Sequence, residues 1–243
     1  MTEFDTIYAQ PQADIARFAF DAKVAAVFSN MIERSVPGYA TTLAMMGVIA
    51  RCHAQPATSI YDLGCSLGAG ILAMMQPLTQ QNCHFIGIDN SPAMLEGCVQ
   101  NLAQSGHNHS YELRCADIQE IAIQNASIVA LNFTLQFIPV EQRLPLLRKI
   151  FAGLHHGGVL VVSEKIQFAD PDQQELNEQL HQQFKQANGY SELEISQKRT
   201  ALEKVLVPET IETHRQRFHE AGFQQCDTWF RCFNFVSWVA IKS

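Results

Sequence analysis

The sequence predicts an α/β protein whose mostly parallel sheet of seven strands is covered by helices on both faces. Short apolar segments alternate with helical patterns through residues 57–165, which is typical of parallel strands buried on both faces. The tail at 226–241 has two β-rich runs around Asn234, so an antiparallel hairpin is expected at the sheet edge. A 47% apolar fraction in 243 residues is sufficient for one large core.

The individual elements follow from apolar runs and from helix-boundary residues. Strands are expected at 58–63, 84–89, 111–115, 127–133 and 159–165. Helices are expected at 68–78, 91–103, 141–153, 172–188, 191–206 and 208–221. Ser91 followed by Pro92 predicts an N-cap and a first helical position. His155 to Gly158 predicts a loop after a helix.

We expect one domain over residues 1–243. Its four segments are a helical N-terminal lid (1–56), a ligand-binding core (57–165), a helical insertion (166–222) and the C-terminal hairpin (223–243).

Composition narrows the function classes. The net charge is -7, which argues against a broad nucleic-acid interface because such surfaces need clustered Lys and Arg. Seven cysteines without Cys-x-x-Cys spacing predict reduced, buried thiols of a cytoplasmic protein. No metal site is expected, because the nine His are scattered and form no His-Glu-x-x-His pattern.

Two further patterns are missing from the sequence. The N-terminus has no apolar h-region, so a secretory signal is not expected. No stretch of 18 apolar residues occurs, so no membrane span is expected.

A glycine-rich turn, YDLGCSLGAG, follows the first expected strand. Such a turn allows the backbone to approach a ligand closely, and ligands of open α/β sheets bind at the carboxyl ends of strands. The spacing from Asp62 through Gly64, Ser66 and Gly68 to Gly70 does not match the dinucleotide pattern G-x-G-x-x-G. It resembles the first motif of class I S-adenosylmethionine-dependent enzymes. That resemblance implies that the aspartate orients the turn and that the Gly64 backbone contacts the methionine part of the ligand.

Acidic residues also follow the next two strands. Asp89 is placed to accept hydrogen bonds from both ribose hydroxyls of an adenosine. Asp117 is placed to meet the adenine amino group, beside the Ile118 backbone. A ligand-free Rossmann-like sheet and an NAD enzyme are the alternatives, and the glycine spacing disfavours the second.

The sequence shows no obvious general base or nucleophile. Amino methyltransferases carry Asp/Asn-Pro-Pro-Tyr after the fourth strand, and only Asn132 matches that motif here. Tyr39 could cap a ligand, and Arg199 could clamp a carboxylate. Composition alone favours a solvated helix face for Arg199, because Glu203 lies four residues further on.

Several longer segments carry a more specific resemblance. RSVPGY, YDLGCSLGA, IGIDNSPAM, IVALNFTLQF, NGYSELEISQKR and WFRCFNFVSWVA together resemble the carboxy-S-adenosyl-L-methionine synthases. This resemblance extends over essentially the whole chain, and it favours a functional role for Arg199 over a solvated one.

The resemblance implies a reaction of S-adenosyl-L-methionine with prephenate that yields carboxy-S-adenosyl-L-methionine, phenylpyruvate and water. Prephenate releases carbon dioxide and hydroxide as its ring becomes aromatic. The S-methyl group loses a proton to give a sulfonium ylide, which captures the carbon dioxide. The departing hydroxide is the proton acceptor, so no protein nucleophile is needed.

The resemblance also implies site residues and partners. The residues expected to bind the substrate and product are Tyr39, Gly64, Cys65, Ser66, Asp89, Asn90, Asp117, Ile118, Asn132 and Arg199, with Tyr39 and Arg199 at the reacting groups. A homodimer is expected, with residues 166–222 as its dimer region and with product that co-purifies. Arg199 is expected to act either in the site of its own subunit or in that of the neighbouring subunit. A second enzyme uses that product to carboxymethylate the wobble uridine of tRNA.

Two other functions remain as alternatives. One is a methyltransferase that acts on a small molecule or tRNA, which would produce S-adenosylhomocysteine. The other is a nucleotide-binding scaffold, which would bind ligand without turnover.

Overall fold

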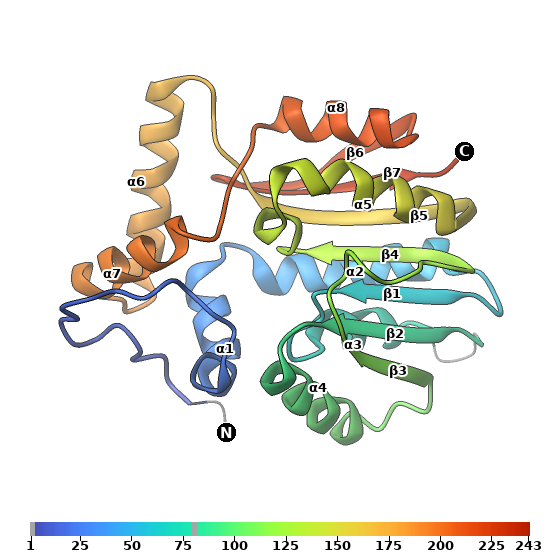
Figure 1. Cartoon of the computed structure of the whole chain (residues 1–243), viewed down its shortest axis with the longest axis horizontal. Coiled ribbons are helices and arrows are strands. Elements are labelled where there is room, and N and C mark those ends of the chain that lie inside the picture. The colour runs from blue at the N-terminus through green and yellow to red at the C-terminus, as the bar shows by residue number, and fades with distance from the viewer. Residues whose placement is uncertain (1–2, 79–81) are drawn as a thin grey trace.

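The computed structural model describes residues 3–78 and 82–243, which contain one seven-stranded sheet. Its strands are β1 (Ser59–Leu63), β2 (His84–Asp89), β3 (Ser110–Cys115), β4 (Ala126–Asn132), β5 (Leu154–Lys165), β6 (Gln225–Cys232) and β7 (Phe235–Ile241). Their order across the sheet is β3-β2-β1-β4-β5-β7-β6. Strands β1 to β5 pair in parallel, and β7 pairs antiparallel with both β5 and β6. The predicted fold class and the edge hairpin are therefore confirmed (Figure 1).

The described residues also form eight α-helices and one short 3-10 helix. They are α1 (Ala22–Ser35), α2 (Tyr39–His53), α3 (Ala69–Met75), α4 (Pro92–Gln104), the 3-10 helix η1 (Leu135–Phe137), α5 (Val140–Gly153), α6 (Pro171–Ala187), α7 (Glu192–Glu203) and α8 (Ile211–Ala221). The predicted cap of α4 is confirmed, because the Ser91 hydroxyl accepts a hydrogen bond from the Met94 backbone and Pro92 opens the helix. Helix α7 begins with a reciprocal capping box between Ser191 and Glu194, which satisfies two backbone N–H groups.

Alternate residues of each central strand pack against opposite faces of the sheet. In β4, Val129 and Leu131 belong to the core cluster that includes α5 and α8 on one face, whereas Ile128 and Ala130 belong to the cluster that includes α2, α3 and α4 on the other. All four of these side chains are fully buried. This two-sided burial explains why the strand segments read as continuous apolar runs.

The N-terminal segment differs from the helical block that the sequence predicts. Helix begins only at Ala22, where the Asp21 side chain caps α1, and residues 3–21 contain no helix. This part is held by contacts with α7: the Phe18 N–H bonds the Ala201 carbonyl, and Gln197 bonds the backbone of Tyr8 and Gln10. Long-range bonds of this kind are not visible in local sequence patterns.

Two element boundaries also differ from expectation. The segment from His155 to Gly158 lies inside β5 rather than in a loop. The β4–β5 register shifts there, and Gly157 and Gly158 exchange backbone hydrogen bonds with Lys242 beyond β7. Helix α8 begins at Ile211 rather than at 208, because Thr210 caps it and Glu209 pairs with Ile166 in an isolated bridge.

The carboxyl ends of the parallel strands face α1, α6 and α7. In Figure 1 the arrowheads of β1, β2 and β4 point toward these helices, and α6 and α7 stand beyond the end of the sheet. Ligand sites of α/β folds lie at this edge.

Three cysteines, Cys65, Cys83 and Cys98, are buried, whereas Cys52 and Cys115 are exposed. The predicted set of buried thiols is therefore only partly correct, although none of the seven forms a disulfide. Among the described residues, no helix has both the length and the apolar character needed to cross a membrane.

Candidate active site

A cavity of about 1160 Å³ opens at the carboxyl ends of the strands. It is larger than the roughly 300–1,000 Å³ typical of a site for one small ligand. Of the ten residues expected to bind substrate and product, eight line it: Gly64, Ser66, Asp89, Asn90, Asp117, Ile118, Asn132 and Arg199. Residues from distant parts of the sequence thus meet in one space.

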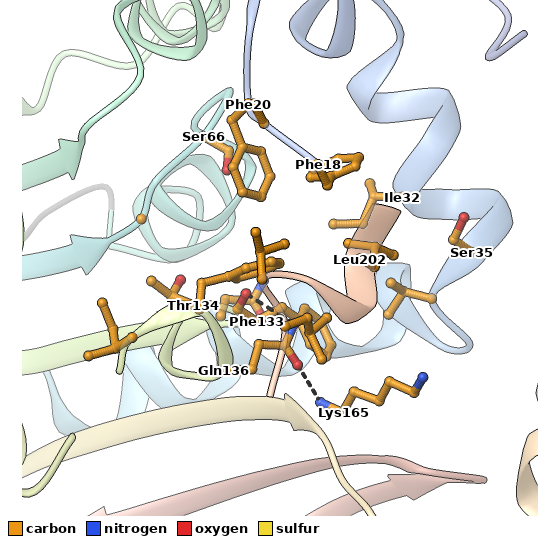
Figure 2. Close-up of a pocket in the computed structure, with 18 of the residues that line it drawn as sticks. Phe18, Phe20, Ile32, Ser35, Ser66, Phe133, Thr134, Gln136, Lys165 and Leu202 are labelled. Atoms are coloured by element: carbon orange, nitrogen blue, oxygen red, sulfur yellow. Dashed lines mark hydrogen bonds between the residues drawn. The ribbon is translucent and has the colours of Figure 1, made fainter. Parts of the chain in front are cut away.

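The glycine-rich turn after β1 uses left-handed backbone conformations at Gly64 (φ 80°) and Ser66 (φ 47°). Ser66 adopts a geometry that usually favours glycine, which agrees with its place in the motif, and it lines the cavity near Phe20 (Figure 2). A Cβ on Gly64 would lie 2.5 Å from the Thr134 hydroxyl oxygen, and one on Gly70 would lie 2.5 Å from the Asp62 carboxylate. These glycines leave room for the turn to fold against its neighbours.

Asp62 is the buried acid of this turn. The Ile71 backbone N–H donates to its carboxylate, but burial, together with the Asp89 charge, raises its pKa to about 7. Asp62 does not line the cavity, so it supports the turn without facing the ligand site.

Asp89, at the end of β2, is held in place by the backbone. Its Oδ2 accepts from the Ser66 N–H and its Oδ1 from the Ser91 N–H, each at 2.9 Å. Burial raises its pKa, while these two N–H groups act in the opposite direction. Each oxygen keeps one lone pair, so the fixed carboxylate can still accept hydroxyl groups.

Two other residues could bind the base and the amino-acid portion of a nucleoside ligand. Asp117 follows β3, and its carboxylate accepts from the Gln119 backbone at 2.8 Å. Asn132, at the end of β4, has a buried Oδ1 without a hydrogen-bond partner in the described part of the chain. Because an unpaired buried oxygen is costly, Asn132 is suited to accept a hydrogen bond from a ligand.

Tyr39 and Cys65 do not line this cavity. The Tyr39 ring lies 6.4 Å from the Phe133 ring, and burial followed by the Asp62 and Glu33 charges raises the pKa of its hydroxyl. A hydrogen bond with Cys98, together with burial, raises the pKa of the Cys65 thiol. Both groups remain protonated at neutral pH. Tyr39 is separated from the cavity by Phe133, which lines it.

Aromatic side chains of the N-terminal segment cover the cavity. The Phe20 ring packs edge-on against Phe18 at 5.2 Å and against Phe137 at 5.3 Å, and all three line the cavity. The Phe20 carbonyl accepts a hydrogen bond from the Ser91 hydroxyl. This segment therefore forms an apolar cover that is attached to the start of α4.

The opposite end of the cavity is cationic. Lys165, Lys185, Lys198 and Arg199 all line it, although the chain as a whole carries a charge of -7. Arg199 is exposed, and its Nη2 approaches the Gln182 side chain at 3.5 Å. The cavity thus has an acidic end at β2 and β3 and a cationic end at β5, α6 and α7.

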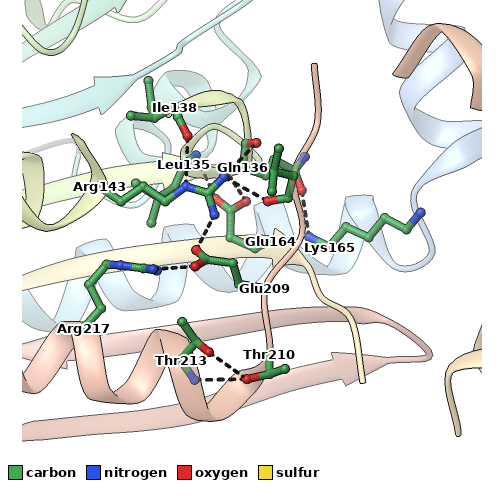
Figure 3. Close-up of polar contacts among 11 residues, drawn as sticks. Leu135, Gln136, Ile138, Arg143, Glu164, Lys165, Glu209, Thr210, Thr213 and Arg217 are labelled. Atoms are coloured by element: carbon green, nitrogen blue, oxygen red, sulfur yellow. Dashed lines mark hydrogen bonds and ion pairs between the residues drawn. The ribbon is translucent and has the colours of Figure 1, made fainter. Parts of the chain in front are cut away.

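A buried polar network includes Gln136 and Lys165, which both line the cavity (Figure 3). The Glu164 carboxylate accepts from the Leu135 and Gln136 backbone N–H groups, both at 2.9 Å. The Gln136 side chain in turn accepts from the Lys165 backbone at 3.0 Å. Burial raises the pKa of Glu164 to about 8, against the lowering effect of these N–H groups and of Arg143. This network fixes η1 relative to the end of β5.

Sequence reasoning overlooked Lys165, Lys185 and the Phe18–Phe20 segment. The position of Lys165 could have been found, because it ends a strand on the same edge as Asp89 and Asp117. Lys185 and the phenylalanines carry no comparable local signal, since they reach the cavity only through tertiary packing. Within residues 3–78 and 82–243, no three His, Cys, Asp or Glu side chains are grouped so that they could hold a metal ion.

Solved structures with the same fold include methyltransferases. The human N-acetylserotonin methyltransferase in complex with SAM aligns with a TM-score of 0.62 at 14% identity, over 91% of this chain and 60% of that one. A putative S-adenosyl-L-methionine-dependent methyltransferase from Methanococcus maripaludis aligns with a TM-score of 0.59 at 18% identity, over 96% and 98% of the two chains. At these identities the similarity shows the fold.

Sequence comparison is more specific. Residues 54–227 match the family model described as a methyltransferase domain. The carboxy-S-adenosyl-L-methionine synthase of Trichlorobacter lovleyi is 55% identical over 239 residues, covering 98% of each chain. The synthase of the same name from Shewanella putrefaciens is 53% identical over 241 residues, covering 99% of each. The chain therefore belongs to the carboxy-S-adenosyl-L-methionine synthase family.

Proposed function

We propose that this enzyme converts S-adenosyl-L-methionine and prephenate to carboxy-S-adenosyl-L-methionine, phenylpyruvate and water. One observation carries the proposal: a single cavity of about 1160 Å³ joins an acidic end suited to adenosine with a cationic end suited to an anion. A methyltransferase needs only the acidic end, which is suited to adenosine. A reaction with a dianionic second substrate also needs the cationic end.

Asp89 holds the ribose, Asp117 and the Ile118 backbone meet the adenine, and the turn at Gly64 contacts the methionine portion. Asn132 supplies a buried amide oxygen for the same ligand. These roles are supported by the position of the residues in the cavity lining and by the backbone hydrogen bonds of Asp89 and Asp117.

The chemistry then follows from proximity and exclusion of water. Prephenate loses its ring carboxyl as carbon dioxide and its hydroxyl as hydroxide. The hydroxide takes a proton from the S-methyl group, and the resulting ylide attacks carbon dioxide to form the new carboxylate. The cover of Phe18, Phe20 and Phe137 keeps the cavity apolar above the reacting groups, which favours capture of carbon dioxide over its escape. Arg199 pairs with the new carboxylate, and Tyr39 supports the site through Phe133.

The enzyme acts as a homodimer in the cytoplasm, and its product co-purifies and serves a downstream tRNA carboxymethyltransferase. Exposed leucines on α6 and α7 support the dimer: Leu176 is 54% exposed, and Leu180 and Leu193 are each 38% exposed. Exposed leucines on these two helices are suited to a contact with a second copy of the chain.

Replacing Arg199 by alanine tests the proposed role of its guanidinium group. We expect the rate of carboxy-S-adenosyl-L-methionine formation to fall about 10- to 100-fold, which is the loss typical of one charge-assisted pair. Liquid chromatography with mass detection measures the product, and calorimetry with S-adenosylhomocysteine checks the adenosine end.

The matched control is Arg215→Ala, at an exposed position of α8 away from the cavity. Its rate is expected to match that of the unmodified enzyme. A normal rate in Arg199→Ala would refute the role given to Arg199.

A further inference from the structure

Three lysines line the cationic end of the cavity, and only one of them has a partner. Lys198 Nζ donates to the Ser35 hydroxyl at 2.9 Å and lies 3.6 Å from the Asp5 carboxylate. Within the described part of the chain, the Nζ atoms of Lys165 and Lys185 make neither hydrogen bonds nor ion pairs. Both side chains are only partly exposed.

The two unpaired lysines come from elements with fixed positions. Lys165 ends β5, and its backbone N–H is bonded to Gln136, so the side chain extends from a rigid strand end into the cavity (Figure 2). Lys185 lies in the last turn of α6. His181, one turn earlier on α6, bonds the Ser35 carbonyl at 2.8 Å and packs against Phe235. Burial lowers the pKa of His181 to about 3, so it forms a neutral wall beside the lysines.

The ammonium groups repel one another across this space. Burial, followed by repulsion from Lys165, Arg199 and Lys198, lowers the pKa of Lys185 to about 7. Burial likewise lowers the pKa of Lys165, although Glu178 and Glu203 act in the opposite direction. The charged and titratable groups around the two lysines are Asp5, Glu178, His181, Lys198, Arg199 and Glu203.

The surrounding acids do not neutralise the cluster. Asp5 is taken by Lys198, while Glu178 and Glu203 are exposed. Because Lys198 and Asp5 neutralise each other, the remaining cations are Lys165, Lys185 and Arg199. Only the two exposed carboxylates are left to balance their three charges. Buried cations without a partner are costly unless an anion joins them.

We propose that Lys165 and Lys185 form a carboxylate subsite that binds the second substrate, separate from the adenosine end and from Arg199. The inference rests on the proposed function, and it extends that function by assigning each carboxylate of a dianion its own cations. The carboxylate that leaves as carbon dioxide reacts beside the sulfonium and Arg199. The other carboxylate, on the side chain that persists in the product, is held between Lys165 and Lys185.

This placement explains why a second anchor is useful. The substrate loses one carboxylate during the reaction, so binding through that group alone would release the remaining fragment early. A second ion pair that is unchanged by the reaction holds the ring in register with the S-methyl group while carbon dioxide is transferred.

Calorimetry with prephenate tests the subsite on the enzyme saturated with S-adenosylhomocysteine, which has no S-methyl group to react. The variants are Lys165→Met and Lys185→Met, which keep the length of the side chain but remove its charge. We expect prephenate Kd to rise about 10- to 100-fold in each. S-adenosylhomocysteine should bind all variants as it binds the unmodified enzyme, which shows that the cavity is intact.

Two matched variants separate charge from packing. Lys23→Met changes an exposed lysine of α1 outside the cavity and should leave prephenate binding unchanged. Lys185→Arg keeps the charge and should retain most of the affinity.

The pH dependence provides a readout that loss of packing would not produce. A bound carboxylate favours charged Lys185, so binding takes up a proton and affinity falls as the pH rises from 7 to 9. This fall should be smaller in Lys185→Met. Unchanged prephenate affinity in both methionine variants would overturn the subsite while leaving the proposed reaction intact. An unmodified enzyme that neither binds nor converts prephenate would overturn both.

Discussion

Replacing Asp89 by alanine is expected to weaken S-adenosylmethionine binding about 100- to 10,000-fold. The Asp89 carboxylate is the proposed acceptor for both ribose hydroxyls, and hydrogen bonds to a charged group contribute about 1.5–3 kcal/mol each. The same change also frees the Ser66 and Ser91 N–H groups, which now donate to this carboxylate at 2.9 Å. The glycine-rich turn therefore loses its anchor at the same time as the ligand does.

Calorimetry with S-adenosylhomocysteine measures this loss without turnover. Asp89→Asn separates the two contributions, because its amide keeps one acceptor oxygen but presents an N–H group to a backbone N–H. We expect an intermediate loss of affinity for this variant. The control is Asp227→Ala, at an exposed position of β6. If Asp89→Ala binds within threefold of the unmodified enzyme, ribose recognition by Asp89 is wrong.

Replacing Glu209 by alanine is expected to produce the largest loss of stability, about 3–5 kcal/mol in the free energy of unfolding. Glu209 forms ion pairs with Arg143 and, at 2.6 Å, with Arg217 (Figure 3). Arg143 is fully buried and also donates to the carbonyls of Ile138, Gln136 and Val207. Removing the carboxylate leaves two guanidinium groups without their counter-charge.

The pH dependence of this network has a defined sign. Burial of Glu209 favours the neutral acid, but the hydrogen bonds and charges of Arg217 and Arg143 outweigh it and hold the pKa below the ordinary value of 4.5. A carboxyl group whose pKa is lower in the folded state stabilises the fold fully at pH values above its pKa in the unfolded state. This stabilisation is lost as the pH falls through its pKa in the folded state. Below pH 4.5, the free energy of unfolding of the unmodified enzyme should therefore fall toward that of Glu209→Gln.

Urea unfolding at several pH values measures both effects. The control is Glu220→Ala, at an exposed position of α8 where the side chain bonds only Gln216 in the described structure; we expect a change within about 0.5 kcal/mol. A loss in Glu209→Ala no larger than that of the control would contradict the account of this network.

The sheet and part of the cavity lining could be predicted from local patterns. Strand ends carry their signal in adjacent residues, so Gly64, Ser66, Asp89 and Asp117 were found by reading where each apolar run stops. The same rule would have found Lys165. The position of Arg199 was favoured by family resemblance, because its helix pattern alone indicates solvent.

The parts that could not be predicted depend on contacts between distant segments. The cover residues Phe18 and Phe20 belong to a stretch without helix, which is held by bonds to α7 and to Ser91. The pairing of Glu209 with two arginines across α5 and α8 leaves no periodic trace in the sequence. In the sequence, Lys185 resembles any surface lysine of a polar helix. Only the packing of α6 in the folded chain brings it to the same cavity as Lys165 at the end of β5.

In the proposed reaction, one cavity brings the S-methyl group of S-adenosylmethionine to an anion that supplies carbon dioxide. The most direct test is mass spectrometry of the purified protein incubated with S-adenosylmethionine, with and without prephenate. We expect a product heavier than S-adenosylmethionine by one carbon dioxide, formed together with phenylpyruvate and only when prephenate is present. S-adenosylmethionine that stays unchanged with prephenate, or that becomes S-adenosylhomocysteine with an added acceptor such as unmodified tRNA, would contradict the account.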